Sequence, residues 1–224
     1  MISRGRARLA AWAVLVAEAA FVVLYAVALR TYPGGTWFDR QEPASFWKNF
    51  LCDLEWEVAL DGLPNPVGAR AMKLGMIALS LAFAPLWLLV PRVFARGGGV
   101  ALGRAVEIAG VVSALGTLAV PLTPSDRFGA WHSLAVVVAG IAGLLAAVLG
   151  LLGLFRHEVR PKIAAAIGAG MLATAAVDLV LYVRLVVTKG DVPLALPVLQ
   201  KVALVLTLSF MTWVAAAALR DARP

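Results

Sequence analysis

Side chains that can bind a ligand or move a proton are few in this sequence, and most of them interrupt apolar segments. A charged side chain at the centre of a membrane costs about 2.5–3.5 kcal/mol on insertion scales, so each one needs a partner or a purpose. Their positions predict one polar cavity near the outer leaflet, and a purely structural ion pair among Lys73, Asp178 and Lys201 is the alternative. The candidate cavity residues are Lys73, Asp126, His132, Asp178, Gln200 and Lys201.

Ser125, Asp126 and His132 allow two catalytic interpretations. They could act as nucleophile, orienting acid and base, or Asp126 and His132 could bind a metal ion. The run Thr123-Pro124-Ser125-Asp126 also predicts a capping box, with Thr123 as the N-cap, Pro124 at the first helical position and Asp126 at the third. Capping accounts for Asp126 and leaves His132 without a structural role, so His132 is the stronger functional candidate.

The longest polar interval, residues 31–67, carries the single cysteine, Cys52, and a dense group of acids. From Pro43 to Asp61 apolar residues recur at every third or fourth position, which predicts an amphipathic helix. Such a helix either lies on the outer membrane surface as an anchor, or folds over the mouth of the bundle as a lid or binding element. The candidate functional residues of this outer loop are Trp47, Asn49, Asp53 and Glu57.

The elements that must position these residues are membrane-spanning helices. Of the 224 residues, 62% are hydrophobic and 15% are charged, whereas about a quarter of residues are charged in soluble domains. A helix needs roughly 20 residues to cross an apolar core of about 30 Å. We therefore predict an all-α polytopic membrane bundle, a single transmembrane domain over residues 1–224, with six spans at about 9–29, 71–91, 105–122, 130–154, 163–186 and 195–219.

Lysine and arginine residues gather at one set of predicted helix ends, as they do in cytoplasmic loops. This pattern predicts six crossings with both termini inside, the residue 31–67 loop outside, and a place in the bacterial inner (plasma) membrane. A cleaved signal peptide is the alternative for the first segment, but its apolar run is longer than usual. The gathered basic residues are Arg4, Arg6, Arg8, Arg92, Arg96, Arg104, Arg156, Arg160, Lys162, Arg220 and Arg223.

Known cofactor motifs are missing from the sequence. His132 and His157 lie about 25 residues apart on one predicted helix, nearly a bilayer thickness at about 1.5 Å per residue, so they cannot ligate one iron. Walker, Rossmann, HExxH and paired CxxC patterns do not occur. We expect no metal, no cofactor and no nucleic-acid partner, because the basic helix ends account for the net charge of +7. Glycines such as Gly140 and Gly143 predict close helix packing, within the chain, with a second copy or with a membrane-protein partner.

Several short motifs resemble those of bacterial six-helix membrane proteins of unknown function. They are Asn65-Pro66 leading into a helix, Ser113-Ala114-Leu115-Gly116, and Pro121 with Thr123-Pro124-Ser125-Asp126 followed by His132. Over residues 65–150 the layout is similar to that of Frag/DRAM/Sfk-type membrane proteins, whose eukaryotic members are tied to lipid and GPI-anchor handling. The resemblance implies a lipid-related function. Ceramidase-like hydrolases are a second comparison, but they use several histidines around zinc and this chain has two.

Together these observations predict an integral membrane protein whose outer-leaflet polar cavity binds or handles a lipid or lipid-like molecule without catalysis. One alternative is a membrane-embedded hydrolase or transferase acting on a lipid headgroup, with His132 as base and the loop acids as metal ligands. Another is an accessory subunit that packs against a larger membrane complex through its glycine-rich helices.

Overall fold

Long helices account for most of the chain. A computed structural model of the protein describes residues 3–94, 99–156 and 162–221. Each long helix has 24 to 31 residues, about 36–46 Å at about 1.5 Å per residue, which exceeds the roughly 30 Å apolar core of a bilayer. The elements of the described residues are α1 (Arg4–Thr31), the short 3₁₀ helix η1 (Cys52–Glu55), α2 (Pro66–Phe94), α3 (Gly99–Leu122), α4 (Ser125–Phe155), α5 (Lys162–Thr188) and α6 (Ala195–Asp221).

The predicted all-α membrane fold is confirmed. Within the described residues, six helices are long and apolar enough to span a membrane, as in a multi-pass integral membrane protein. Five of them begin earlier than predicted. Among these, α2 begins at Pro66, a first helical position that suits proline, and α4 begins at Ser125. The predicted features at Arg96, His157, Arg160 and Arg223 lie outside the described residues.

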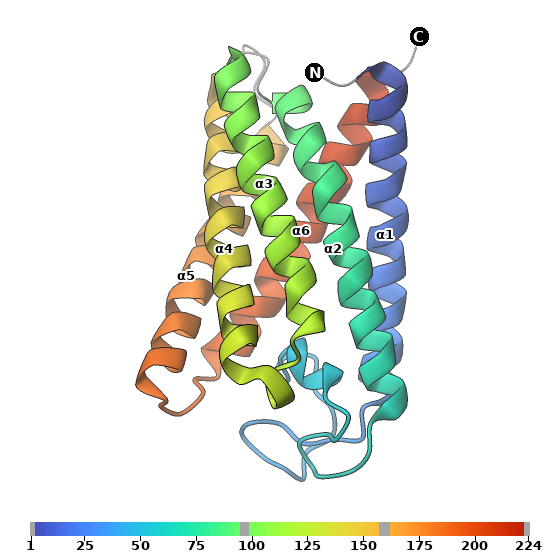
Figure 1. Cartoon of the computed structure of the whole chain (residues 1–224), viewed down its shortest axis with the longest axis vertical. Coiled ribbons are helices and arrows are strands. Elements are labelled where there is room, and N and C mark those ends of the chain that lie inside the picture. Colours follow the sequence, from blue (N-terminus) through green and yellow to red (C-terminus); the bar gives the residue numbers. More distant parts are fainter. Residues whose placement is uncertain (1–2, 95–98, 157–161, 222–224) are drawn as a thin grey trace.

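The helices form a bundle with both ends of the chain at the same end (Figure 1). α1 packs on α2, α2 on α3 and α3 on α4, while α6 crosses behind them and contacts α1, α2 and α5. Residues 32–65 cover the opposite end, which we call the loop end. Towards the loop end α5 leans away from the other helices, at the lower left of Figure 1.

Glycines make the closest helix contacts possible. A Cβ atom on Gly110 would lie 2.1 Å from Trp87 Cγ, so α2 and α3 could not approach as they do with any side chain at this position. A Cβ atom on Gly116 would lie 2.7 Å from the backbone nitrogen of Ala139 in α4. Close backbone approach of this kind supplies the van der Waals contact on which helix association depends in lipid.

The amphipathic helix predicted for Pro43 to Asp61 is wrong, because the segment is irregular apart from the four residues of η1. Two side chains of α6 take backbone groups that a helix would pair with its own backbone. Gln200 Oε1 accepts a hydrogen bond from the backbone nitrogen of Leu51 at 2.9 Å. Lys201 Nζ donates to the carbonyl oxygen of Asn49 at 2.7 Å. These bonds compete with helical pairing, so the periodic apolar residues pack the loop onto the bundle instead.

Candidate functional site

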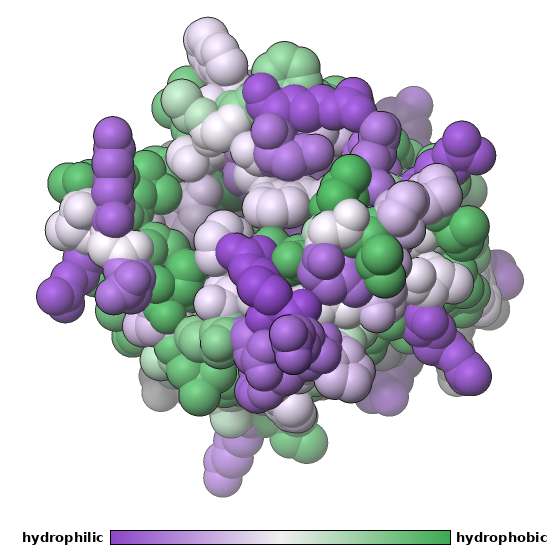
Figure 2. Space-filling view, turned by 90° about the horizontal axis from the view of Figure 1, so that it is seen from below, coloured by the Kyte–Doolittle hydropathy of each residue, from purple (hydrophilic) through white to green (hydrophobic). Residues whose placement is uncertain are grey.

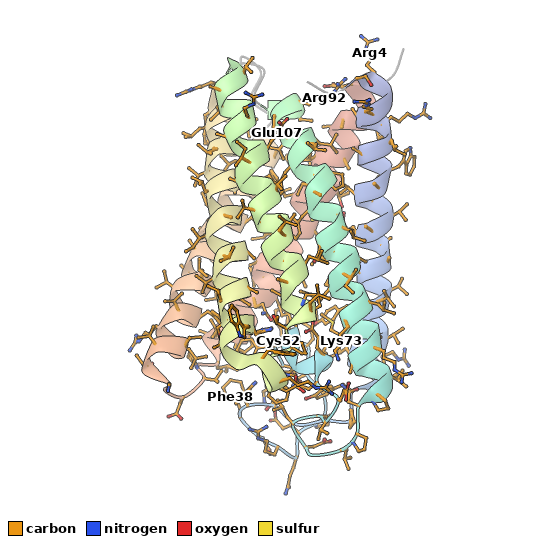
Figure 3. All side chains as sticks on the ribbon, in the orientation of Figure 1. Arg4, Phe38, Cys52, Lys73, Arg92 and Glu107 are labelled. Carbon is orange, nitrogen blue, oxygen red and sulfur yellow. The ribbon has the colours of Figure 1, made fainter. Side chains whose placement is uncertain are left out.

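A cavity of about 700 Å³ lies between the residue 32–65 loop and the loop ends of α4, α5 and α6. Its volume is within the roughly 300–1,000 Å³ that is typical of small-molecule sites. The loop contributes η1 and the tryptophans Trp37 and Trp56 to the lining. Figure 3 shows Cys52 of η1 and Lys73 of α2 at this end of the bundle, and Glu107 and Arg92 at the opposite end.

Specific bonds hold the loop against the helices and so define one wall of the cavity. Trp56 Nε1 donates a hydrogen bond to Ser125 Oγ of α4 at 2.9 Å. Glu57 forms an ion pair with Arg127 of α4, with 2.5 Å between the nearest oxygen and nitrogen. Together with the bonds from Gln200 and Lys201 of α6, these contacts tie the loop to both neighbouring helices.

Four carboxyl groups line the cavity, and those of Asp53, Glu55 and Asp126 lie at its loop end. Asp53 and Glu55 reach the cavity from η1, Asp126 from the first turn of α4, and Asp178 from α5. The four residues come from three separate parts of the chain. Their proximity is therefore a product of the tertiary fold and of the irregular path of the loop.

The structure brings together part of the predicted polar cavity. Lys73 and Lys201 lie outside the lining: Lys201 Nζ bonds to the carbonyl oxygen of Asn49, and Lys73 Nζ lies 3.8 Å from Glu57 Oε1. Among the described residues no ion pair joins Asp178 to either lysine, so the structural ion pair considered as the alternative is not formed. The predicted residues that do line the cavity are Asp126, His132, Asp178 and Gln200.

Glu55 is the cavity carboxyl group that the protein supports least. It is 1% exposed, and within the described chain neither of its oxygens accepts a hydrogen bond. Burial raises the pKa of Glu55 to about 8, and Asp126 adds to the increase while Lys73 opposes it. A buried polar group without a partner costs about 1–3 kcal/mol.

Asp53 differs from Glu55 because its oxygens have donors. Oδ1 accepts a hydrogen bond from Trp37 Nε1 at 3.0 Å, and Oδ2 accepts one from the backbone nitrogen of Phe50 at 2.7 Å. Burial raises the pKa of Asp53 to about 6, and these hydrogen bonds and Lys201 limit the increase. Asp53 is therefore ionised at neutral pH and holds Trp37 at the cavity.

His132 and Ser125 have structural partners, which bears on the catalytic interpretations. His132 is buried, and its Nδ1 donates a hydrogen bond to the carbonyl oxygen of Thr123 at 2.9 Å. Ser125 Oγ accepts the hydrogen bond from Trp56. Because no hydrogen bond joins Ser125 to His132 among the described residues, the nucleophile–base contact of an acyl-transfer site is not formed in this structure.

The capping box predicted from Thr123 to Asp126 is wrong. The hydroxyl of Thr123 donates to the carbonyl oxygen of Ala119 at 2.8 Å and so belongs to the end of α3. Pro124 takes the N-cap position of α4 and has no side-chain hydrogen bond to offer. Asp126 keeps a favourable place in the first turn of α4, where the helix dipole attracts a negative charge.

The outer-loop candidates have different surroundings. Asp53 lines the cavity, Asn49 is buried within the loop, and Trp47 is 51% exposed. Glu57 lies at the surface and pairs with basic residues of α2 and α4. The prediction left out Glu55, because three acids at alternate positions give no sign in the sequence of which ones the fold buries, and it buries both Asp53 and Glu55.

Away from the loop the cavity continues between α4 and α5, and its lining becomes apolar. Small residues on both helices leave this part of the space open, and aliphatic side chains border it. Apart from the carboxyl group of Asp178, which lies between Ala175 and Leu179 on α5, the cavity is therefore polar at the loop end and apolar at the end that faces the middle of the bundle. The residues at its apolar end are Val136, Ala139, Gly140, Leu144, Ala175 and Leu179.

In residues 3–94, 99–156 and 162–221, no three His, Cys, Asp or Glu side chains come together as possible ligands of one metal ion. No protein-family model, curated protein or solved structure matches the chain. The function therefore has to be inferred from the cavity and the residues around it.

Proposed function

We propose that this integral membrane protein binds a lipid or lipid-like amphiphile in the cavity between the residue 32–65 loop, α4, α5 and α6. The observation that carries the proposal is the separation of polar and apolar lining along one cavity. A wholly apolar ligand would bury the carboxyl groups without partners, which is costly, and a wholly polar ligand would leave the apolar end without contacts. An amphiphile matches both ends.

The outer surface of α5 supports entry from the membrane. Val177, Val180 and Val187 of α5 are exposed, as expected for side chains that face lipid. Figure 2 views the loop end, and on the left it shows side chains standing apart from the central mass, on the side where Figure 1 shows α5. Because α4 and α5 both line the apolar part of the cavity, an amphiphile can reach it between these helices without leaving the bilayer.

The proposed cavity belongs to the outer leaflet of a bacterial plasma membrane. Arg4 and Arg92 lie at the end of the bundle opposite the loop (Figure 3), and basic residues favour the cytoplasmic side. A fluorescent protein fused to the C-terminus should fold and fluoresce, whereas alkaline phosphatase fused there should stay inactive. The reverse pattern would move the cavity to the inner leaflet.

Native mass spectrometry of the protein extracted in a mild detergent tests amphiphile binding. We expect lipid adducts that survive purification on the wild-type protein. Ala175→Phe should remove most of them, because Ala175 lines the apolar end of the cavity and the phenyl ring would fill it. Ala173→Phe is the matched control, since Ala173 is exposed on the same helix. A lipid-free wild-type protein, or equal adducts on both variants, would refute the proposal.

A further inference from the structure

The polar end of the cavity is lined by more acidic than basic side chains. Carboxyl groups of Asp53, Glu55 and Asp126 line it, and Lys189 is the single lysine or arginine in the part of the lining that the structure describes. The buried ammonium group of Lys201 is directed to the loop backbone instead. Like charges brought together in a buried site cost several kcal/mol, so this end disfavours an anionic head.

One of these carboxyl groups offers acceptors that the described chain leaves unfilled. Both oxygens of Glu55 are buried and accept no hydrogen bond from any described residue, and Glu55 lines the cavity from η1. A complementary ligand would therefore bring N–H or O–H donors to the polar end, together with a positive charge.

We infer that the head of the bound amphiphile is a primary ammonium group that donates hydrogen bonds to Glu55. The inference rests on the proposed function. A primary ammonium group has a positive charge and three N–H donors, and its bonds to carboxylates are roughly twice as strong as neutral hydrogen bonds. A primary ammonium group therefore supplies both the positive charge and the N–H donors that the polar end lacks.

A quaternary ammonium group fits the site less well. It has no N–H donor, and proteins recognise it mainly with open aromatic faces. The guanidinium carbon of Arg40 already lies over the ring of Trp37, 5.2 Å from its centroid. The rings of Trp56 and Trp37 meet edge-on, with 6.0 Å between their centroids. The unfilled positions are thus carboxylate oxygens rather than ring faces.

The inference predicts how binding depends on pH. The pKa of the buried Glu55 carboxyl is about 8, with Lys73 of α2 and Asp126 of α4 acting on it in opposite directions, and Asp53 shares η1 with it. An ammonium group beside Glu55 favours the carboxylate form, so affinity should rise with pH up to about 8 and level off above it. The alkylammonium itself, like a lysine side chain, stays protonated to about pH 10.

Protection of Cys52 provides a direct test, because Cys52 is the sole cysteine of the chain and lines the cavity. The full-length protein in dodecyl maltoside is mixed with dodecylamine, dodecyltrimethylammonium or dodecyl sulfate and labelled with a maleimide at pH 8. Burial raises the pKa of the Cys52 thiol, so labelling is slow enough to compare rates. We expect dodecylamine to protect at concentrations about tenfold lower than dodecyltrimethylammonium, and dodecyl sulfate to protect least.

Substitutions assign the preference to residues. Glu55→Gln should abolish most of the preference for dodecylamine. Glu107→Gln is the matched control, because Glu107 lies at the opposite end of the bundle (Figure 3). If Glu55→Gln fails to fold, the loss of preference between pH 8 and pH 6 in the wild-type protein tests the same point.

The outcomes separate this inference from the proposed function. Equal protection by the three probes would leave amphiphile binding intact and overturn the ammonium head, whereas protection by none would overturn both. A preference that persists in Glu55→Gln would also overturn the inference.

A second arm identifies the source of the ammonium group. Native mass spectrometry with phosphatidylethanolamine, phosphatidylcholine and phosphatidylglycerol of identical acyl chains compares headgroups directly. Selective retention of phosphatidylethanolamine would support a lipid headgroup. Selectivity for dodecylamine without selectivity for phosphatidylethanolamine would support a free alkylamine, and either result would support the ammonium head.

Discussion

Lys201 and Asn49 are 152 residues apart in the sequence, yet Lys201 Nζ donates a hydrogen bond to the carbonyl oxygen of Asn49 at 2.7 Å. Lys201 is 1% exposed, and its Nζ also donates to Gln200 Oε1 at 3.1 Å. The bond joins α6 to the residue 32–65 loop just before η1. It explains how a lysine can lie within a membrane-spanning helix and why this lysine is not part of the cavity lining.

Lys201→Met should destabilise the protein and loosen the loop. Methionine keeps the length of the side chain and leaves the carbonyl oxygen of Asn49 without its donor, at a cost of about 1–3 kcal/mol. Thermal unfolding in detergent, followed by tryptophan fluorescence, measures the loss. Lys162→Met is the control, because Lys162 is exposed at the start of α5. Equal melting temperatures for the two variants would contradict this role of Lys201.

The hydrogen bond from Trp56 Nε1 to Ser125 Oγ should appear as a coupling energy between the two residues. We expect Trp56→Phe and Ser125→Ala each to lower the stability, and the double variant to lose less than the sum. The coupling should be about 1 kcal/mol, the usual size for one hydrogen bond. Chemical unfolding of the four proteins measures it. Additive losses would show that the loop does not depend on this contact.

Gly35→Ala should destabilise the folded protein much more than Gly62→Ala does. Both glycines have a left-handed backbone, with φ of +83° and +87°, which costs a non-glycine residue roughly 1–2 kcal/mol. A Cβ atom at Gly35 would also lie 2.4 Å from the backbone nitrogen of Asp61, whereas a Cβ atom at Gly62 would meet no atom within 4 Å. The difference between the two melting temperatures isolates the steric clash, and similar values would rule it out.

Glu55→Gln should change how stability depends on pH. The pKa of Glu55 rises on folding from its ordinary 4.5 to about 8, so the folded state binds this proton more tightly than the unfolded state. The resulting stabilisation is complete below pH 4.5 and is lost as the pH rises to 8. At about 1.4 kcal/mol per pKa unit, the loss has an upper limit of roughly 5 kcal/mol.

Melting temperatures at pH 5, 7 and 9 test this dependence. The Glu55→Gln variant should match the wild-type protein near pH 5 and exceed it at pH 9, because glutamine has no charge to bury. Glu107→Gln should follow the wild-type curve throughout. Parallel curves for the wild-type protein and Glu55→Gln would mean that Glu55 finds a partner or water at high pH.

Local sequence patterns located some features of the site and misplaced others. Asp126, His132, Asp178 and Gln200 were predicted to share a cavity and do line one, because residues at similar depth in neighbouring helices come together in a bundle. The helix predicted for Pro43 to Asp61 did not form. Its apolar spacing is compatible with a helix, but the loop makes its hydrogen bonds to other partners.

The sequence by itself determined the membrane-spanning helices, because hydrophobicity and length are properties of contiguous residues. Only the tertiary structure decided the course of the loop, since Gln200 and Lys201 lie 149 and 152 residues beyond the backbone groups that they bind. It also decided which acid is buried without a hydrogen-bond partner. Asp53, Glu55 and Glu57 are equivalent in sequence spacing, and burial among residues of distant helices leaves Glu55 alone of the three without a described partner.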